Sequence, residues 1–287
     1  MNLRTEIKTV AVFGAGTMGA GIAQTFAQSG FNVLAHDPKP GAVDHALIQI
    51  EKSIDKFVSK GKLDAAAGNA TKTRLRPASL SDAKSADLAV EAVFEDVSVK
   101  RSLWKELHAL MPTDVIFASN TSSISISELA AASGRPAQFI GMHFFNPVPL
   151  MSLVEVVVGL QTGEPVVEFT MSLAKRLGKT PLRVKDHPGF VSNRVLMPMI
   201  NEAVGALADG VADAPTIDEV MKLGCNHPMG PLALADLVGL DVCLNILEVL
   251  HRDLGEDRYR PNPLLRTMVR AGLLGKKSGK GFYSYAH

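Results

Sequence analysis

A glycine-rich turn near the start of the chain restricts the possible folds more than any other feature. The apolar segment Val10–Phe13 runs directly into a GxGxxG pattern, and a helical pattern follows. In a dinucleotide-binding βα turn, Gly14 permits the tight turn and Gly16 lets the backbone approach a pyrophosphate, while Gly19 lets the helix pack closely on the strand. The predicted cofactor contacts of this turn are Gly14, Gly16, Thr17, Met18 and Gly19.

An acidic residue about 20 positions after the last glycine supports this interpretation. Asp37 ends the second apolar run, Asn32–Ala35, and no arginine stands beside it. A carboxylate at this place accepts hydrogen bonds from the adenosine ribose and repels the additional phosphate of NADP. We therefore predict NAD as the cofactor. The alternative is an ordinary βα turn followed by a solvated aspartate.

Residues 1–186 alternate short apolar runs with helical patterns, which predicts an α/β fold with a Rossmann-type, doubly wound, mostly parallel sheet. A longer helical insert, marked by Leu47, Ile50 and Ile54, separates the second and third runs. The predicted strands are Val10–Phe13, Asn32–Ala35, Leu88–Val93, Val115–Ala118, Phe139–Met142 and Leu153–Val158.

The pattern becomes helical beyond Asp186, and no convincing strand follows. We predict two domains, residues 1–186 with the dinucleotide site and an all-helical domain over residues 187–287. The first helix of this second domain contains Pro198, which we expect to bend it. Further helices are predicted around Ile217–Leu223, Leu232–Leu237, Asp241–Leu250 and Leu264–Ala271.

Charge and composition exclude several classes of protein. The 287 residues carry 30 Lys and Arg against 29 Asp and Glu, a net charge of +1 that makes nucleic acid an unlikely partner. Two cysteines cannot staple a chain of this length, so a reducing compartment is expected. We also see no signal peptide and no 18-residue apolar run, and predict a cytoplasmic protein without membrane contact or a metal site.

Polar clusters follow two of the predicted strands, and both fit an alcohol dehydrogenase. Residues 118–123 read ASNTSS, and His143 stands at the end of the run Phe139–Met142. An alcohol loses a hydride efficiently only if a base removes its proton, and histidine, with a pKa of about 6.5, suits that task. Glu155, in an apolar run, would need a partner if buried and could orient the imidazole. Alone, a structural histidine or a water-facing Glu155 is the simpler alternative; beside a dinucleotide fingerprint, the catalytic pair is favoured.

Five segments carry a resemblance to a known family. GAGTMGAGIAQ, SNTSSISI, HFFNPVPLMSLVEVV, DHPGFVSNRV and GKKSGKGFYSY occur in this order. Over essentially its whole length the chain resembles the 3-hydroxyacyl-CoA dehydrogenase family, and most of all its small stand-alone bacterial 3-hydroxybutyryl-CoA group. The resemblance implies reversible hydride transfer between NAD and C3 of a short 3-hydroxyacyl-CoA, and a C-terminal domain that binds substrate and forms a homodimer.

The resemblance also implies roles for single residues. His143 would be the general base, Glu155 its orienting partner, Ser122 the contact of the C3 oxygen, and Asn193 the residue that positions the substrate. The alternative for Asn193 is a residue near a helix start that binds only the local backbone. Further cofactor contacts would be Asn120, Glu95 and Lys100, the last two beside the nicotinamide unless they form an exposed charge pair.

A basic stripe could hold the anionic CoA. Lys52, Lys56 and Lys60 recur every fourth residue on the inserted helix, with Lys56 at the centre, although Glu51 and Asp55 beside them also fit a solvated face. Two rival functions remain: an NAD-dependent dehydrogenase of a free hydroxy or sugar acid, of the gulonate type, and a catalytically silent NAD-binding protein. The combination of Ser122, His143, Glu155 and Asn193 argues against the silent protein.

Overall fold

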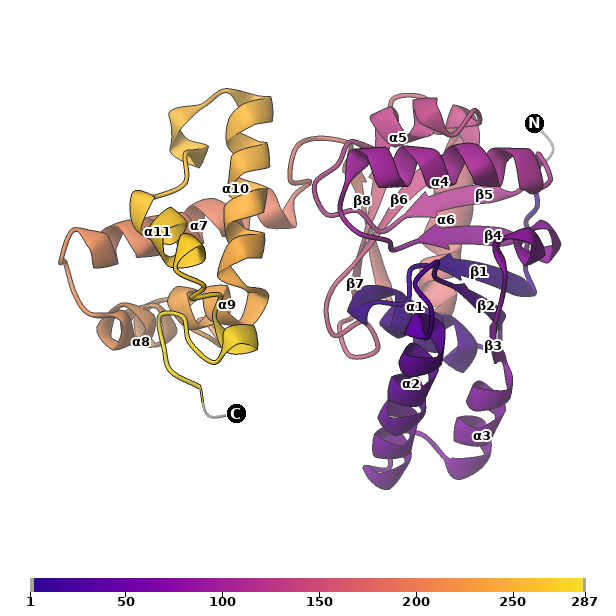
Figure 1. Cartoon of the computed structure of the whole chain (residues 1–287), viewed down its shortest axis with the longest axis horizontal. Coiled ribbons are helices and arrows are strands. Elements are labelled where there is room, and N and C mark those ends of the chain that lie inside the picture. Colours follow the sequence, from indigo (N-terminus) through magenta and orange to yellow (C-terminus); the bar gives the residue numbers. More distant parts are fainter. Residues whose placement is uncertain (1–2, 286–287) are drawn as a thin grey trace. The chain divides into compact units, whose positions relative to one another are not determined.

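The computed structural model describes residues 3–285, and contacts within the chain divide it into unit 1, Met1–Asp186, and unit 2, His187–His287. Unit 1 contains the sheet and its flanking helices, coloured indigo to pink in Figure 1, whereas unit 2, orange to yellow, is helical. In residues 3–285 no helix combines the length and the apolar character needed to cross a bilayer.

Unit 1 is built on one eight-stranded sheet with the order β3-β2-β1-β4-β5-β6-β7-β8. Neighbouring strands are parallel except β6 and β7, which are antiparallel. The predicted Rossmann-type, mostly parallel sheet is therefore confirmed. The strands are β1 (Thr9–Phe13), β2 (Asn32–His36), β3 (Leu75–Pro77), β4 (Leu88–Glu91), β5 (Ile116–Ser119), β6 (Phe139–Phe144), β7 (Leu153–Val158) and β8 (Thr180–Lys185).

Two of these strands were missed by the sequence prediction, and both lie at an edge of the sheet. β3 has only three residues, and β8 alternates apolar positions with the exposed Arg183 and Lys185. Polar, partly exposed strands are usual at sheet edges, where they discourage pairing with other chains. The predicted strand Leu88–Val93 was too long, because the chain leaves the sheet after Glu91.

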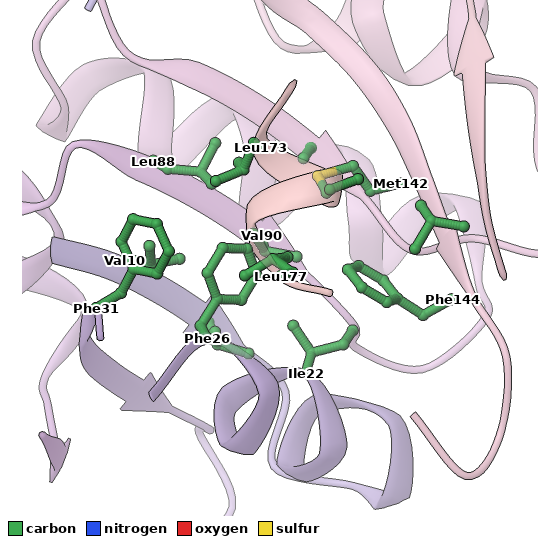
Figure 2. Packing of buried hydrophobic residues seen from close by; sticks show 14 of the residues in the cluster. Val10, Ile22, Phe26, Phe31, Leu88, Val90, Met142, Phe144, Leu173 and Leu177 are labelled. Atoms are coloured by element: carbon green, nitrogen blue, oxygen red, sulfur yellow. The ribbon is translucent and has the colours of Figure 1, made fainter. Parts of the chain in front are cut away.

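Helices cover both faces of this sheet. On one face, Ile22 and Phe26 of α1 pack with Val90, Phe144 and Leu173 (Figure 2). On the other, Trp104 of α4 stacks on Phe117 with 4.8 Å between ring centroids, and each such buried side chain contributes about 1.5–3 kcal/mol. The helices of unit 1 are α1 (Thr17–Gln28), α2 (Ala42–Ser59), α3 (Ala65–Thr73), α4 (Val97–Leu110), α5 (Ile126–Ala132) and α6 (Glu164–Arg176).

Unit 2 is helical, as its sequence predicts. Its core gathers Met197, Ile200, Leu232, Leu247 and Leu265, one or two from each of four helices. The helices are α7 (Ser192–Ala208), α8 (Ala214–Cys225), α9 (Pro231–Val238), α10 (Leu240–Leu254) and α11 (Pro263–Arg270). Pro198 lies inside α7, and the bend expected there stays a prediction.

Two buried carboxylates hold the last segment of unit 2. Asp236 accepts hydrogen bonds from the backbone N–H groups of Phe282 and Tyr283 at 3.0 and 2.9 Å, and from the Tyr285 hydroxyl at 3.0 Å. Asp218 accepts the Tyr283 hydroxyl at 2.7 Å. Burial, reinforced by these carboxylates, raises the pKa of Tyr285 to about 12, so the tyrosine stays a donor at neutral pH.

Candidate active site

The glycine turn has the geometry that its spacing predicts. Gly14 adopts φ +100°, and a Cβ there would lie 2.4 Å from the carbonyl oxygen of Ala92. A Cβ on Gly19 would lie 1.8 Å from the Gly14 carbonyl oxygen, so neither position accepts a side chain. Gly16 directly precedes α1 as its N-cap residue, and it provides no side chain that caps the helix by a hydrogen bond. The uncapped N–H groups of this helix start suit a phosphate.

Asp37 connects the glycine turn to the end of β2. Its Oδ2 accepts a hydrogen bond from Ala15 N at 2.8 Å, and its Oδ1 accepts one from Lys39 N at 2.9 Å. Because an ionised carboxylate has about four acceptor positions, further hydrogen bonds to a ribose are compatible with these two. The structure thus places the acidic residue beside the turn, where a dinucleotide site needs it.

A largely apolar pocket of about 430 Å³ adjoins Asp37, and sequence reasoning missed it. Its lining comes from β1, the end of β2, the segment before β4, and α4, so no single motif marks it. The lining residues include Phe13, Gly14, His36, Pro38, Leu80, Val99 and Leu103. A largely apolar pocket next to this carboxylate would suit an aromatic base.

His143 and Glu155 form a buried pair across two antiparallel strands. They are register partners in β6 and β7, and His143 Nδ1 lies 2.8 Å from Glu155 Oε2. Their exposed fractions are 7% and 2%. Glu155 is thus not water-facing, because β8 covers the outer edge of β7. The contact fixes which imidazole nitrogen faces the carboxylate; the catalytic role of the pair stays a prediction.

The loop after β5, residues 120–123 of the ASNTSS motif, is held by hydrogen bonds on two sides. Asn120 Oδ1 accepts a hydrogen bond from Phe144 N at 2.9 Å, which ties the loop to the strand that carries His143. Glu95 Oε1 accepts hydrogen bonds from Thr121 Oγ1 at 2.6 Å and from Ser122 N at 2.8 Å. The loop therefore holds the half-buried Ser122 at the same edge of the sheet as His143, where β5 and β6 end.

Glu95 and Lys100 belong to a buried chain of charges. Lys100 is 1% exposed, and its Nζ lies 2.5 Å from Glu91 Oε1 and 3.1 Å from Glu95 Oε2. The alternative of an exposed charge pair is therefore wrong. Glu91, which sequence reasoning missed, also accepts a hydrogen bond from Ser119 Oγ at 2.6 Å. Only its position at the end of a buried strand could have indicated this role.

The two carboxylates around Lys100 respond differently to burial. Desolvation raises the pKa of Glu91 despite the nearby Lys100 ammonium. Desolvation acts on Glu95 in the same direction, but Lys100 and the hydrogen bonds from Thr121 and Ser122 outweigh it and lower the Glu95 pKa. The Lys100 ammonium therefore contacts two carboxylates whose pKa values are shifted in opposite directions, upward for Glu91 and downward for Glu95.

A second pocket, of about 470 Å³, lies between the glycine turn, α1, α2 and the turn after His143. We call it the α1–α2 pocket. Its lining includes Gly16, Thr17, Gln24, His45, Gln49, Ile50, Ser53, Asn146, Pro147 and Val148. Lys179, buried before β8, donates hydrogen bonds to the carbonyl oxygens of Val148 at 2.6 Å and Met151 at 2.8 Å. This lysine, also missed from sequence, fixes one wall of the pocket, and its burial lowers its pKa.

The predicted CoA lysines and Asn193 occupy two different places. Lys52 and Lys56 are exposed on α2, the helix that also supplies Gln49 and Ser53 to the α1–α2 pocket, and Lys60 is exposed directly after that helix. Asn193 is buried in the first turn of α7 in unit 2, so its contact with the substrate stays a prediction. Residues 3–285 contain no cluster of three or more His, Cys, Asp or Glu that could hold a metal ion.

Comparison with known proteins identifies the family. Residues 9–187 match the model of the NAD binding domain of 3-hydroxyacyl-CoA dehydrogenase, and residues 189–285 match that of its C-terminal domain. The chain belongs to the 3-hydroxyacyl-CoA dehydrogenase family. The predicted family, the fold class and NAD as the cofactor are thereby confirmed.

Individual relatives match over nearly their whole length. A probable 3-hydroxybutyryl-CoA dehydrogenase of Deinococcus radiodurans is 56% identical over 96% of this chain and 99% of its own. The 3-hydroxybutyryl-CoA dehydrogenase of Clostridioides difficile is 49% identical, with 96% and 99% covered. The crystal structure of (S)-3-hydroxybutyryl-CoA dehydrogenase from Ralstonia eutropha is similar with a TM-score of 0.94 and 48% identity, covering 98% of this chain and 100% of that one.

Proposed function

We propose that this protein is an NAD-dependent dehydrogenase that interconverts short-chain 3-hydroxyacyl-CoA and 3-oxoacyl-CoA, with 3-hydroxybutyryl-CoA and acetoacetyl-CoA as the substrate pair. The observation that carries the proposal is the buried His143–Glu155 contact of 2.8 Å at the end of β6. It lies at the carboxyl edge of the parallel strands, where ligands bind in open α/β sheets, and the glycine turn follows β1 at the same edge.

Unit 1 would hold NAD along this edge. The uncapped start of α1 at Gly16 suits the pyrophosphate, Asp37 the adenosine ribose, and the pocket beside Asp37 the adenine. At the other end of the cofactor, we assign Asn120, Glu95 and Lys100 to the nicotinamide half. When bound, NAD accepts a hydride from C3 of the hydroxyacyl group, and NADH returns one to the ketone.

His143 performs the proton transfer in this proposal. Because Nδ1 faces Glu155, we assign the transfer to Nε2. In the oxidation, Nε2 takes the hydroxyl proton as the C3 hydrogen leaves with its electron pair, and the Glu155 carboxylate stabilises the imidazolium. In the reduction, the imidazolium returns that proton to the C3 oxygen. Ser122 would donate a hydrogen bond to this oxygen, and Asn193 would position the acyl group.

The α1–α2 pocket would receive the arm of CoA. It begins at the glycine turn and extends along α2, where Ser53 lines it and Lys56 lies three residues further on the same helix. Residues three or four apart are neighbours on a helix surface, so we assign the CoA phosphates to Lys52, Lys56 and Lys60, which lie outside the pocket lining.

We assign pairing of two copies to unit 2. Its surface exposes several large apolar side chains, and pairing of two copies would remove such side chains from water. They are Val195, Val211, Val220, Leu223 and Leu237. We also place the protein in the cytoplasm, because Cys225 and Cys243 are both free thiols, as expected in a reducing compartment.

The test follows absorbance at 340 nm with purified protein, NADH and acetoacetyl-CoA. A parallel reaction contains acetoacetate, and a third contains the His143→Ala variant. Rapid NADH consumption with the thioester alone, abolished in the variant, supports the proposal. If the protein oxidises a free hydroxy acid with NAD but does not turn over the thioester, the proposal is wrong and the gulonate-type activity takes its place. NADH binding without any turnover would indicate a silent NAD-binding protein.

A further inference from the structure

Gln24 is a buried polar residue that lacks a partner at one end. It lies in the middle of α1 and is 2% exposed. Its Nε2 has no hydrogen-bond partner among residues 3–285. Buried amide groups are nearly always hydrogen-bonded in native proteins, so such a group requires an explanation, for which a ligand or an ordered water is the usual one.

The location of Gln24 favours a ligand. Gln24 lines the α1–α2 pocket together with Ala20 and Gly21, which lie on the same side of α1 at spacings of three and four residues. A Cβ on Gly21 would lie 2.9 Å from Val148 Cβ, so the helix and the opposite wall are close at this level. Because Gln24 is itself part of the lining, a molecule in the pocket would lie near its side chain.

Much of the lining near Gln24 is apolar. Ile50, Pro147 and Val148 contribute hydrocarbon, and no Lys, Arg, Asp or Glu lines the pocket. A neutral primary amide in such surroundings recognises a neutral group that both donates and accepts, such as another amide. It would not recognise a phosphate, for which the exposed lysines of α2 are suited.

We propose that the Gln24 amide hydrogen-bonds a secondary amide of the thioester arm and thereby makes the enzyme selective for amide-bearing thioesters. This inference rests on the proposed function, because the arm of CoA carries two secondary amides between its sulfur and its phosphates. Gln24 then determines substrate specificity without contacting the reacting carbon. Its hydrogen bond forms only with substrate, which is why Nε2 has no partner among the described residues of the chain.

The test compares Gln24→Met with the matched control Gln28→Met, one turn further along α1 and outside the pocket lining. Each protein reduces acetoacetyl-CoA, acetoacetyl-N-acetylcysteamine, which has one amide, and S-ethyl acetothioacetate, which has none. We expect Gln24→Met to lower kcat/KM about tenfold for acetoacetyl-CoA, equivalent to about 1.4 kcal/mol, and to leave the amide-free thioester within about twofold. Gln28→Met should resemble the wild type, and melting temperatures should be unchanged.

The truncated substrate locates the contact. A tenfold loss that persists with the N-acetylcysteamine ester assigns Gln24 to the amide nearest the sulfur, and a loss confined to the CoA ester assigns it to the second amide. Equal losses on all three thioesters, a lowered melting temperature, or no loss at all would each overturn the inference. Gln24→Leu replaces Gln24→Met if the latter does not fold. A wild type inactive on acetoacetyl-CoA overturns the proposed function, and this inference with it.

Discussion

Units 1 and 2 each bury two carboxylates but provide them with different partners. In unit 1, Glu91 faces the Lys100 ammonium and Glu155 faces the His143 imidazole. Both partners are side chains with titratable nitrogens. Because the desolvation of a buried charge is costly, such pairs are retained where they serve binding or chemistry more often than for stability alone.

In unit 2, Asp218 and Asp236 bind groups that keep their protons at neutral pH. Asp218 accepts the N–H groups at the start of α9, from Leu232 at 2.8 Å and Ala233 at 2.9 Å, and Asp236 accepts those of the last segment of the chain. These carboxylates fix the path of the chain. The comparison teaches that the partner of a buried carboxylate, more than the carboxylate itself, separates a chemical role from an architectural one.

The largest effect should come from the imidazole on the chemical side of this comparison. His143→Ala removes the group that we propose transfers the proton, so kcat for acetoacetyl-CoA reduction should fall about 10³-fold, or about 4 kcal/mol. The unfolding midpoint in urea should change little by comparison, and His251→Ala should be fully active. Retention of more than a tenth of kcat in His143→Ala would remove this residue from the chemistry.

On the architectural side, Asp236→Ala should damage the fold and spare the chemistry. The change leaves the N–H groups of Phe282 and Tyr283 and the Tyr285 hydroxyl without their acceptor, so the free energy of unfolding should fall by about 3 kcal/mol. Urea titration followed by circular dichroism measures it, with Asp209→Ala, an exposed aspartate of unit 2, as the control. If Asp236→Ala kept the full free energy of unfolding but lost activity per folded molecule, Asp236 would have a chemical role and not an architectural one.

Glu155→Gln separates charge from orientation within the proposed catalytic pair. The amide oxygen can still accept a hydrogen bond from His143, but it no longer stabilises an imidazolium. We expect kcat to fall about 30-fold, or about 2 kcal/mol, with KM for NADH unchanged. Glu168→Gln, at an exposed glutamate of unit 1, is the control. An unchanged kcat would assign Glu155 to the architectural class.

The smallest effect concerns the pH dependence of stability. Burial favours the neutral form of Glu95, but Lys100 and the loop hydrogen bonds outweigh it, so the folded-state pKa lies below the ordinary 4.5. Ionised Glu95 therefore stabilises the fold above pH 4.5, and this contribution is lost as the pH falls below that value. The unfolding free energy of wild type should exceed that of Glu95→Gln by about 1 kcal/mol at pH 7. The difference should shrink towards pH 3.

Glu128→Gln is the matched control for this measurement. Its carboxylate pairs with the half-exposed Arg101, and an exposed pair of this kind contributes about 0–1 kcal/mol. A Glu95→Gln difference that stays constant from pH 7 to pH 3 would show that the carboxylate charge does not hold the loop.

The sequence by itself determined the fold class, the family and NAD as the cofactor. The three glycines, Asp37 and the strand before them fix one local structure, because every requirement lies within a short stretch of chain. The helices of unit 2 were equally readable, since each carries its own periodicity and its own Gly or Pro boundaries. His143 at a strand end was likewise visible before any tertiary contact was known.

Only the tertiary structure decided which charges meet. The antiparallel register of β6 and β7 sets Glu155 opposite His143, and an offset of one residue would turn one side chain to the other face of the sheet. In the sequence, Glu91 stood inside a predicted strand and Lys179 stood outside every predicted strand. Their roles depend on Lys100 from α4 and on the carbonyl groups of a turn about 30 residues away, and such meetings are fixed by packing, which local patterns do not encode.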